Sequence, residues 1–425
     1  MKLNLDLETH INYDGYWQQP MRNTLPALSF VQNTVNSLAG HVGVGVEGSN
    51  ATVPGDDKWH GNTVSDLVLP PLEPHGPASR YFDVFWRGTD TCEWSAAPEV
   101  SWLKLSQDSG KVGSDGGEDV RVLVSVDWES VPEDFTEKTL YINVTTPCRN
   151  FDRFAYQEPR VMVPVIKRSP PPKEFKGFVE SDRVVSIEGE HYQSIVPGTK
   201  DDKALTYHTF KNYGRISSGI GLVPLGIEKL KVGEGPALEY NLYLYTNTTA
   251  NVTLHLSPSH NYLGDFDPLQ YAIALFPKGS EDVEPKIVTP VGKTEGTQMP
   301  AFWGYSVADA VWGLRSNITT SSFEVEKEGE YVLRIWSLLP SIIVQKIVVD
   351  LGGLRPSYLG PPESFLVGRD TVGERNGTSF RDAPNVVGGV KSALTAEEEE
   401  ESSAARLGGV SWVVAVVGVL AWLTL

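Results

Sequence analysis

The chain has 425 residues, which is enough for two or three domains with separate cores. Its 54 aspartates and glutamates exceed its 36 lysines and arginines, and the formal net charge of −18 argues against nucleic acid as a partner. The 40 glycines and 29 prolines favour turn-rich β structure over helical bundles.

Residues 1–75 differ in pattern from the rest of the chain. Apolar side chains recur at helical spacing over residues 24–39, which predicts a short helix whose apolar stripe has no partner helix in this chain. The opening residues are polar and contain no apolar segment of the kind that a secretory signal needs. We therefore expect a short helical N-terminal segment that is the end of a larger helical region.

Residues 76–169 contain at least five short strand-like runs separated by turn-forming clusters. This arrangement predicts an immunoglobulin-like β-sandwich. We expect Trp86, Trp102 and Trp128 to lie in its core, because large aromatic side chains are usually mostly buried.

The only two cysteines, Cys92 and Cys148, fall within this region. In a secreted chain an even pair predicts one disulfide, and a bridge closing so long a loop contributes about 4 kcal/mol by the chain-entropy estimate. The alternative is two buried free thiols. Neither cysteine has the spacing of a metal or redox site.

The proline-rich run SPPPKEF separates this region from a second series of strand-like runs. Over residues 174–364 these runs predict a second, larger β-sandwich of the jelly-roll kind. Strands do not alternate with helices anywhere in the sequence, so a (β/α) barrel is not expected. Trp312 and Trp336 are expected in the second core.

The C-terminal region loses this patterning. Residues 365–406 include five consecutive glutamates and predict a disordered, extended stalk. Residues 407–425 are uncharged and follow small residues, which together favour a glycosylphosphatidylinositol anchor signal with Ser402 as the attachment site. A transmembrane helix or an unanchored apolar tail are the alternatives.

Six Asn-X-Ser/Thr sequences indicate passage through a secretory pathway, although such short patterns also arise by chance. The protein is therefore expected to be secreted or held at the cell surface, with contact to the membrane through its C-terminus. The predicted glycosylation sites are Asn50, Asn143, Asn247, Asn251, Asn317 and Asn376.

Several segments, in order, resemble the C-terminal half of glycoside hydrolase family 115, the xylan α-1,2-glucuronidases. They are YWQQPMRNTLPALSFVQ, GVEGSNATVPGDD, VSVDW, YQEPRVMVPV, GFVESDRVVSIEGEHY, YGRISSG and IVVDLGGLRPSYLGPPES. The resemblance implies a catalytic barrel upstream of Met1, followed by the helical region and the sandwiches found here. It also implies plant cell-wall glucuronoxylan, or a related polysaccharide, as the partner, and a homodimer as an assembly to test.

No catalytic residue is predicted in the chain itself. A glycosidase needs two carboxylates facing each other across the scissile bond, and Asp56 and Asp57 are adjacent residues in a turn-like segment. We expect an ancillary region of a secreted family 115-like α-glucuronidase that supports the barrel or binds carbohydrate. The alternative is a stand-alone cell-surface protein that binds carbohydrate or is purely structural.

Two sites follow from the second predicted sandwich. The spacing of Glu188 and Glu190 resembles the first strand of family 6 and 35 carbohydrate-binding modules, in which such acids and an Asp of the last strand hold a structural calcium; Asp350 is the third candidate ligand here. A solvated acidic strand face is the alternative. Trp303 and Tyr305 are candidates for stacking on sugar rings, and burial of both in the core is the alternative.

Overall fold

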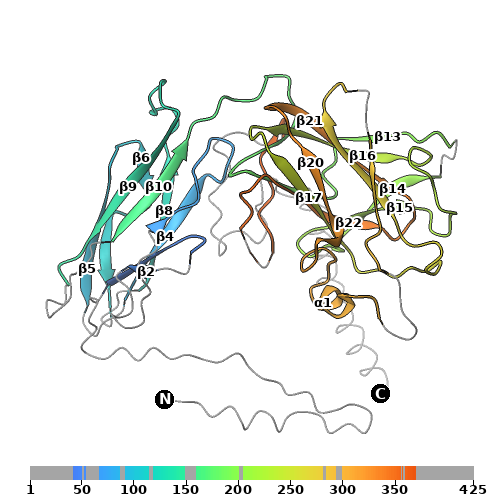
Figure 1. Cartoon of the computed structure of the whole chain (residues 1–425). Coiled ribbons are helices and arrows are strands. Elements are labelled where there is room, and N and C mark those ends of the chain that lie inside the picture. Colours follow the sequence, from blue (N-terminus) through green and yellow to red (C-terminus); the bar gives the residue numbers. More distant parts are fainter. Residues whose placement is uncertain are drawn as a thin grey trace, which may run out of the picture.

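The computed structural model describes residues 42–49, 52–53, 67–86, 91–113, 118–148, 159–200, 204–280, 284–292, 299–355, 357 and 359–369. These residues form two β-sandwiches in succession, seen as two bodies joined by a crossing segment (Figure 1). The predicted class, mainly β with two consecutive sandwiches, is confirmed. The helix predicted at residues 24–39 lies outside the described residues.

The described part of the first sandwich has ten strands: β1 (Val42–Val46), β2 (Thr52–Val53), β3 (Leu67–Val68), β4 (Ser79–Trp86), β5 (Cys92–Pro98), β6 (Leu103–Leu105), β7 (Ser109–Val112), β8 (Val120–Val126), β9 (Glu137–Thr145) and β10 (Arg160–Ile166). One sheet has the order β2-β1-β4-β8-β6 and the other the order β3-β10-β9-β5-β7. Strand β3 runs parallel to β10, whereas the other described pairs in these two sheets are antiparallel.

The alternation seen in the sequence directs side chains into the core between these sheets. In β5, Cys92, Trp94 and Ala96 are buried while the residues between them are exposed, as the two-residue period of a strand requires. Trp102 is buried as predicted, and Trp86 and Trp128 pack against the core while partly exposed.

The first sandwich begins earlier than predicted. Strand β1 pairs with β4 along its whole length, and Leu67, Leu69 and Leu72 are buried, so the described residues 42–49, 52–53 and 67–75 belong to the sandwich and the boundary at residue 76 is wrong. Strand β1 has the sequence VGVGV, in which glycine takes each position between two buried valines. This glycine content is more typical of a loop, because glycine is depleted in strands.

Cys92 and Cys148 form the predicted disulfide, with their Cα atoms 5.8 Å apart. Cys92 begins β5, and Cys148 follows β9, which is the neighbour of β5 in the same sheet. The bridge therefore fastens two segments of one sheet, unlike the inter-sheet disulfide of antibody domains.

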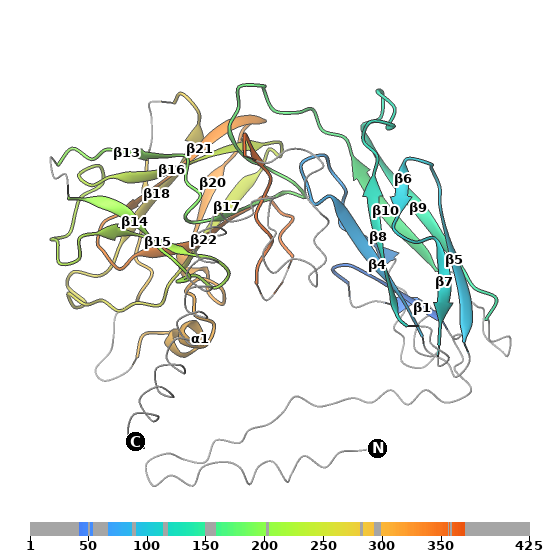
Figure 2. The same ribbon diagram turned by 180° about the vertical axis from the view of Figure 1, so that it is seen from behind.

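The described part of the second sandwich contains strands β11 (Gly177–Val179), β12 (Val184–Glu188), β13 (Ser194–Val196), β14 (Thr206–Phe210), β15 (Gly219–Val223), β16 (Ala237–Leu244), β17 (Thr249–Leu256), β18 (Tyr271–Pro277), β19 (Lys286–Val288), β20 (Thr320–Glu324), β21 (Gly329–Ser337), β22 (Ile343–Asp350) and β23 (Leu366–Val367). It also contains the short helices α1 (Trp303–Ala308) and η2 (Asn317–Thr319). Figure 2 shows α1 below the strands of this sandwich, at one of its ends.

One sheet of the second sandwich has the order β19-β18-β21-β16-β11-β23, with β13 also paired to β16. The other has the order β14-β15-β22-β17-β20, with β12 also paired to β22. Strands β12 and β15 pair with different parts of β22: β15 meets Ile343 and Val344, and β12 meets residues 346–350. The start of β15 and the end of β12 are therefore close to Gln345, which lies between these two pairings.

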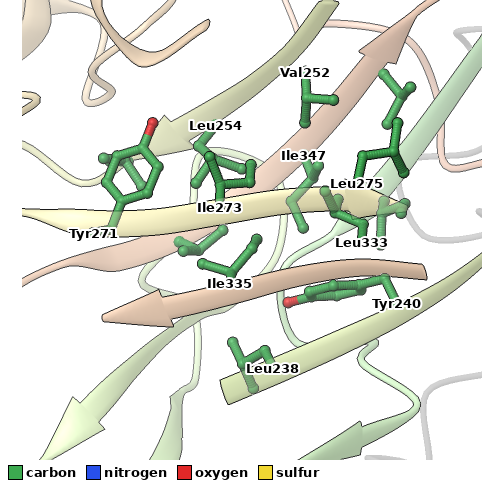
Figure 3. Packing of buried hydrophobic residues seen from close by; sticks show 14 of the residues in the cluster. Leu238, Tyr240, Val252, Leu254, Tyr271, Ile273, Leu275, Leu333, Ile335 and Ile347 are labelled. Atoms are coloured by element: carbon green, nitrogen blue, oxygen red, sulfur yellow. The ribbon is translucent and has the colours of Figure 1, made fainter. Parts of the chain in front are cut away.

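Aliphatic and aromatic side chains from the facing strands fill the second core (Figure 3). Tyr240 and Tyr271 lie in it with their hydroxyl groups donating to the carbonyl oxygens of Gly189 and Thr319, which satisfies the buried phenols. Trp312 is 2% exposed; it and Trp336 are buried, as predicted.

The second sandwich also extends beyond its predicted end at residue 364. Phe365 is buried, and strand β23 pairs with β11. The stalk predicted from residue 365 therefore starts too early, because residues 365–367 complete a sheet edge. Within the described part of the chain, no helix is long and apolar enough to cross a bilayer. The predicted anchor at residues 407–425 lies outside that part.

Charged side chains connect the two sandwiches. Glu73 of the first sandwich accepts a hydrogen bond from the backbone N–H of Asp182 (2.9 Å) and pairs with Arg168 of the connecting segment (3.3 Å). Burial raises the pKa of Glu73, and these two partners oppose that rise. His75 also packs edge-on against Phe365, with ring centroids 5.3 Å apart.

Candidate functional site

Three segments that carry the family resemblance meet at one end of the second sandwich. They are β12 with the turn after it, residues 213–219, and residues 359–364, which we call the strap. Ser217 donates to Glu190 in the turn (2.7 Å), and Glu363 of the strap contacts His191 in the same turn (2.6 Å). Segments far apart in sequence thus form one polar cluster.

The strap forms hydrogen bonds with the edge of β12 that faces away from β22. The backbone N–H of Ser364 donates to Ser186 O (2.8 Å), and the N–H of Ser186 donates to Ser364 Oγ (2.9 Å). The Ser186 hydroxyl donates to Pro361 O (3.0 Å). Because an unpaired strand edge leaves backbone groups without partners, the strap completes the sheet in place of another strand.

Beneath the strap, two buried residues form an ion pair. Glu188 and Lys346 lie opposite each other in the β12–β22 pair, with Lys346 Nζ 3.1 Å from Glu188 Oε1. Lys346 Nζ also donates to Pro361 O (2.8 Å). Burial raises the pKa of Glu188, and the ammonium of Lys346 opposes that rise.

A second charged pair lies beside the first. Glu363 Oε1 accepts the backbone N–H of Glu188 (3.0 Å) and contacts His191 Nδ1 (2.6 Å). Burial disfavours the charged imidazole, but the hydrogen bond and charge of Glu363 outweigh it, so the pKa of His191 is raised. His255, opposite Lys346 on β17, has its pKa lowered to about 4 by burial and by the nearby cations.

The structure does not bring the three predicted calcium ligands together. Asp350 pairs with Val184, four residues before Glu188, and its Oδ1 accepts the N–H groups of three residues in the turn after β22. Glu190 lies beyond the end of β12 and accepts the Ser217 hydroxyl. Across the described residues, no group of three or more His, Cys, Asp or Glu side chains could hold a metal. The prediction grouped Asp350 of the last strand with Glu188 and Glu190 around one ion, whereas the register puts Lys346 opposite Glu188.

The two predicted sugar-binding aromatics lie on α1 and differ in exposure. Trp303 is partly buried: its ring stacks on His260 at 3.9 Å between centroids and lies 5.9 Å from Trp312. Tyr305 is 57% exposed. Trp303 therefore anchors the helix on the core, while Tyr305 presents its ring at the surface.

A charged pair that the sequence did not reveal adjoins Tyr305. Arg315 Nε lies 2.6 Å from Asp309 Oδ2, and its guanidinium lies 5.3 Å from the centre of the Tyr305 ring. The hydrogen bond from Arg315 holds the pKa of Asp309 below its usual value. Together, Tyr305, Trp303, Asp309 and Arg315 define what we call the α1 surface.

Gln345 joins the α1 surface to the polar cluster. Its Nε2 donates to Ala310 O (3.0 Å) just after α1, and its Oε1 accepts the N–H of Arg215 (2.9 Å). Its Nε2 also donates to the Ser257 hydroxyl (2.9 Å). Gln345 and its neighbour Lys346 are buried polar residues in the interior of β22, and this polar pair in a strand that is mostly apolar is the one sequence signal that could have indicated the junction.

The predicted glycosylation sites within the described residues, Asn143, Asn247, Asn251 and Asn317, are all exposed. Exposure is a geometric requirement for carrying a glycan. The other predicted sites, Asn50 and Asn376, and the predicted anchor residue Ser402 lie outside the described residues.

A comparison with protein-family models gives a match within the second sandwich. Residues 177–363 match the model of the glycosyl hydrolase family 115 C-terminal domain. This region is less than half of the 425-residue chain. No curated protein matches the sequence.

Solved structures similar to this chain include a family GH115 4-O-methyl-α-glucuronidase, BtGH115A, with specificity for decorated arabinogalactans. That match has 18% identity and a TM-score of 0.25, and it covers 37% of this chain and 17% of the glucuronidase chain. The C-terminal CBM6 of the laminarinase LamC from Zobellia galactanivorans has 15% identity and a TM-score of 0.21, with 39% of this chain and 98% of that chain covered. A CBM6 module of lichenase 5A from Cellvibrio mixtus, in complex with cellotriose, has 12% identity and a TM-score of 0.21, with 39% and 95% covered.

Proposed function

We propose that the chain is the ancillary, carbohydrate-binding part of a secreted family 115-like α-glucuronidase, because residues 177–363 match the model of the glycosyl hydrolase family 115 C-terminal domain. Catalysis is assigned to a barrel domain outside these two sandwiches. The partner is a plant cell-wall glucuronoxylan or a related polysaccharide. The family match is the observation that carries this proposal.

The α1 surface is the proposed contact with the polysaccharide. Sugar rings stack on flat aromatic faces, and Tyr305 offers an exposed ring held on a helix that Trp303 anchors to the core. Arg315 and Asp309 supply hydrogen-bonding groups beside the ring, which suits the hydroxyl groups of a saccharide.

Calorimetric titration of the chain with glucuronoxylan oligosaccharides tests this function. We expect measurable binding, and about tenfold weaker binding for Tyr305→Ala, because one aromatic stacking contact is worth about 1 kcal/mol or somewhat more. Tyr141→Ala is the matched control, since Tyr141 also has an arginine, Arg160, over its ring but lies in the first sandwich. Equal weakening by both variants would reject the α1 surface, and absence of binding to any xylan would reject the carbohydrate-binding function.

Export and anchoring are further parts of the proposal. Exposure of Asn143, Asn247, Asn251 and Asn317 supports glycosylation during secretion. We expect the protein purified from a eukaryotic host to lose mass on treatment with an N-glycosidase.

Release from membranes by a phosphatidylinositol-specific phospholipase would support anchoring at Ser402. Analytical sedimentation of the purified chain would test for the homodimer.

A further inference from the structure

The ammonium group of Lys346 lies beside Glu188, where the sequence predicted a divalent cation. Lys346 and Glu188 are both buried, at 4% and 6% exposure, and face each other across β22 and β12. Lys346 Nζ lies 3.1 Å from the Glu188 carboxylate and 2.8 Å from the carbonyl oxygen of Pro361. A carboxylate and a carbonyl oxygen are ligands that calcium prefers, yet here they surround an ammonium group.

The remaining charges beneath the strap are also matched from within the chain. Glu363 is the second carboxylate of the cluster, and His191 contacts it at 2.6 Å. Two carboxylates therefore face two basic side chains, Lys346 and His191. Glu188 has Lys346 and Glu363 has His191 as a partner from within the chain, so neither of these carboxylates needs a metal as its counter-charge.

The carboxylates predicted to complete a calcium site have other roles. Asp350 Oδ1 accepts three backbone N–H groups at 2.8–3.1 Å, and Glu190 accepts the Ser217 hydroxyl. A divalent ion beside Glu188 would also lie against the Lys346 ammonium, and like charges repel strongly where water is excluded. The residues therefore do not fit the metal that carbohydrate-binding sandwiches of this kind hold.

We propose that the ammonium group of Lys346 is the structural cation of the second sandwich, so that the sandwich folds and holds its strap without a divalent metal. Lys346 neutralises Glu188 and also binds the strap through Pro361. This inference concerns folding and is independent of the proposed sugar binding.

Thermal unfolding of the full chain tests the proposal directly. We expect the Tm of the wild type to be the same with excess CaCl₂ and with EDTA. A calcium ion at one hundred times its Kd would raise the Tm of a chain of 425 residues that unfolds in one transition by about 3 °C. A calcium-dependent rise in Tm, or a fall with EDTA, would overturn the inference, and this comparison requires no variant to fold.

Variants then test the role of the lysine. Lys346→Met should lower the Tm, because Glu188 remains buried without a cation. The double variant Glu188→Gln/Lys346→Met should regain most of that loss, since neither charge remains. The matched control is Lys278→Met, which removes a lysine from the exposed pair with Glu330 and should change the Tm little. A Lys346→Met protein that melts like the control would overturn the proposal, whereas recovery only in the double variant would support it.

Discussion

Arg80 of the first sandwich forms a salt bridge with Asp182 of the second, with Arg80 Nη2 3.7 Å from Asp182 Oδ2. Both side chains are largely buried, and each has a further partner: Arg80 pairs with Glu47, and Asp182 pairs with Arg355. Asp182 also adopts a left-handed backbone conformation (φ 52°), in which aspartate and asparagine are tolerated better than most residues. The two sandwiches thus share one buried charge network.

Replacing Asp182 by asparagine should weaken this junction without straining the backbone. We expect Asp182→Asn to lose about 1–3 kcal/mol of unfolding free energy, because it removes the charged partner of two arginines. In urea unfolding followed by tryptophan fluorescence, the single transition expected of the wild type should separate into two. Asp83→Asn, which weakens a half-buried pair with Arg121 that lies entirely inside the first sandwich, should leave a single transition. A variant that unfolds like this control would show that the network does not couple the sandwiches.

The disulfide should stabilise the first sandwich substantially. Cys92 and Cys148 are separated by 56 positions, and the chain-entropy estimate for such a loop is about 4 kcal/mol. We therefore expect Cys92→Ala/Cys148→Ala to lose about this amount of unfolding free energy in guanidinium titrations. Adding a reductant should lower the stability of the wild type and leave the double variant unchanged. If the variant is as stable as the oxidised wild type, the bridge contributes no net stability.

Most of the strand pattern could be predicted from the sequence, because half-buried strands alternate apolar and polar residues. Strand β1 was missed because glycine occupies every second position in it. The second sandwich was predicted to end at residue 364 because strand β23, which follows, is only two residues long. Short edge strands depend on pairing with a neighbour, as β23 does with β11. Whether such a short segment forms a strand is therefore decided by its tertiary contacts and not by its local sequence pattern.

The candidate sites were predictable only in part. Tyr305 and Trp303 were found because aromatic residues stand out in a glycine-containing segment, but their different exposure depends on how α1 packs. The calcium prediction was wrong because it depended on the strand register. Glu188 pairs with Lys346, and Asp350 lies four residues further along β22, where it pairs with Val184. Register is set by the whole sheet, and a single sequence does not reveal it.

Gly189 is required by a close approach of two backbones. A Cβ at this position would lie 2.5 Å from the carbonyl oxygen of Val344. We expect Gly189→Ala to lose about 1–3 kcal/mol of unfolding free energy through overpacking. Gly292→Ala is the control, because its Cβ would meet no atom within 4 Å, and it should be close to neutral. Similar urea midpoints for both variants would contradict the structural reason given for this glycine.

His255 should make the second sandwich sensitive to acid. Its pKa is lowered to about 4 by burial, then by Lys346 and Arg215, whereas an unfolded histidine titrates near 6.5. A depressed pKa means that the unfolded chain takes up the proton first, so stability is lost as the pH falls from about 6.5 to about 4. The loss from this one group is at most about 3 kcal/mol.

The measurement is the urea midpoint of the wild type and of His255→Gln across this pH range. Carboxylates titrate in both proteins, so the difference between the two curves isolates His255. We expect the variant to lose less stability than the wild type between neutral pH and pH 4, by up to about 3 kcal/mol. His208→Gln, which replaces an exposed histidine on β14, should follow the wild-type curve. Parallel curves for the wild type and His255→Gln would mean that His255 is not the acid-sensitive group, and that the histidine opposite Lys346 accepts a proton in the folded state as readily as in the unfolded chain.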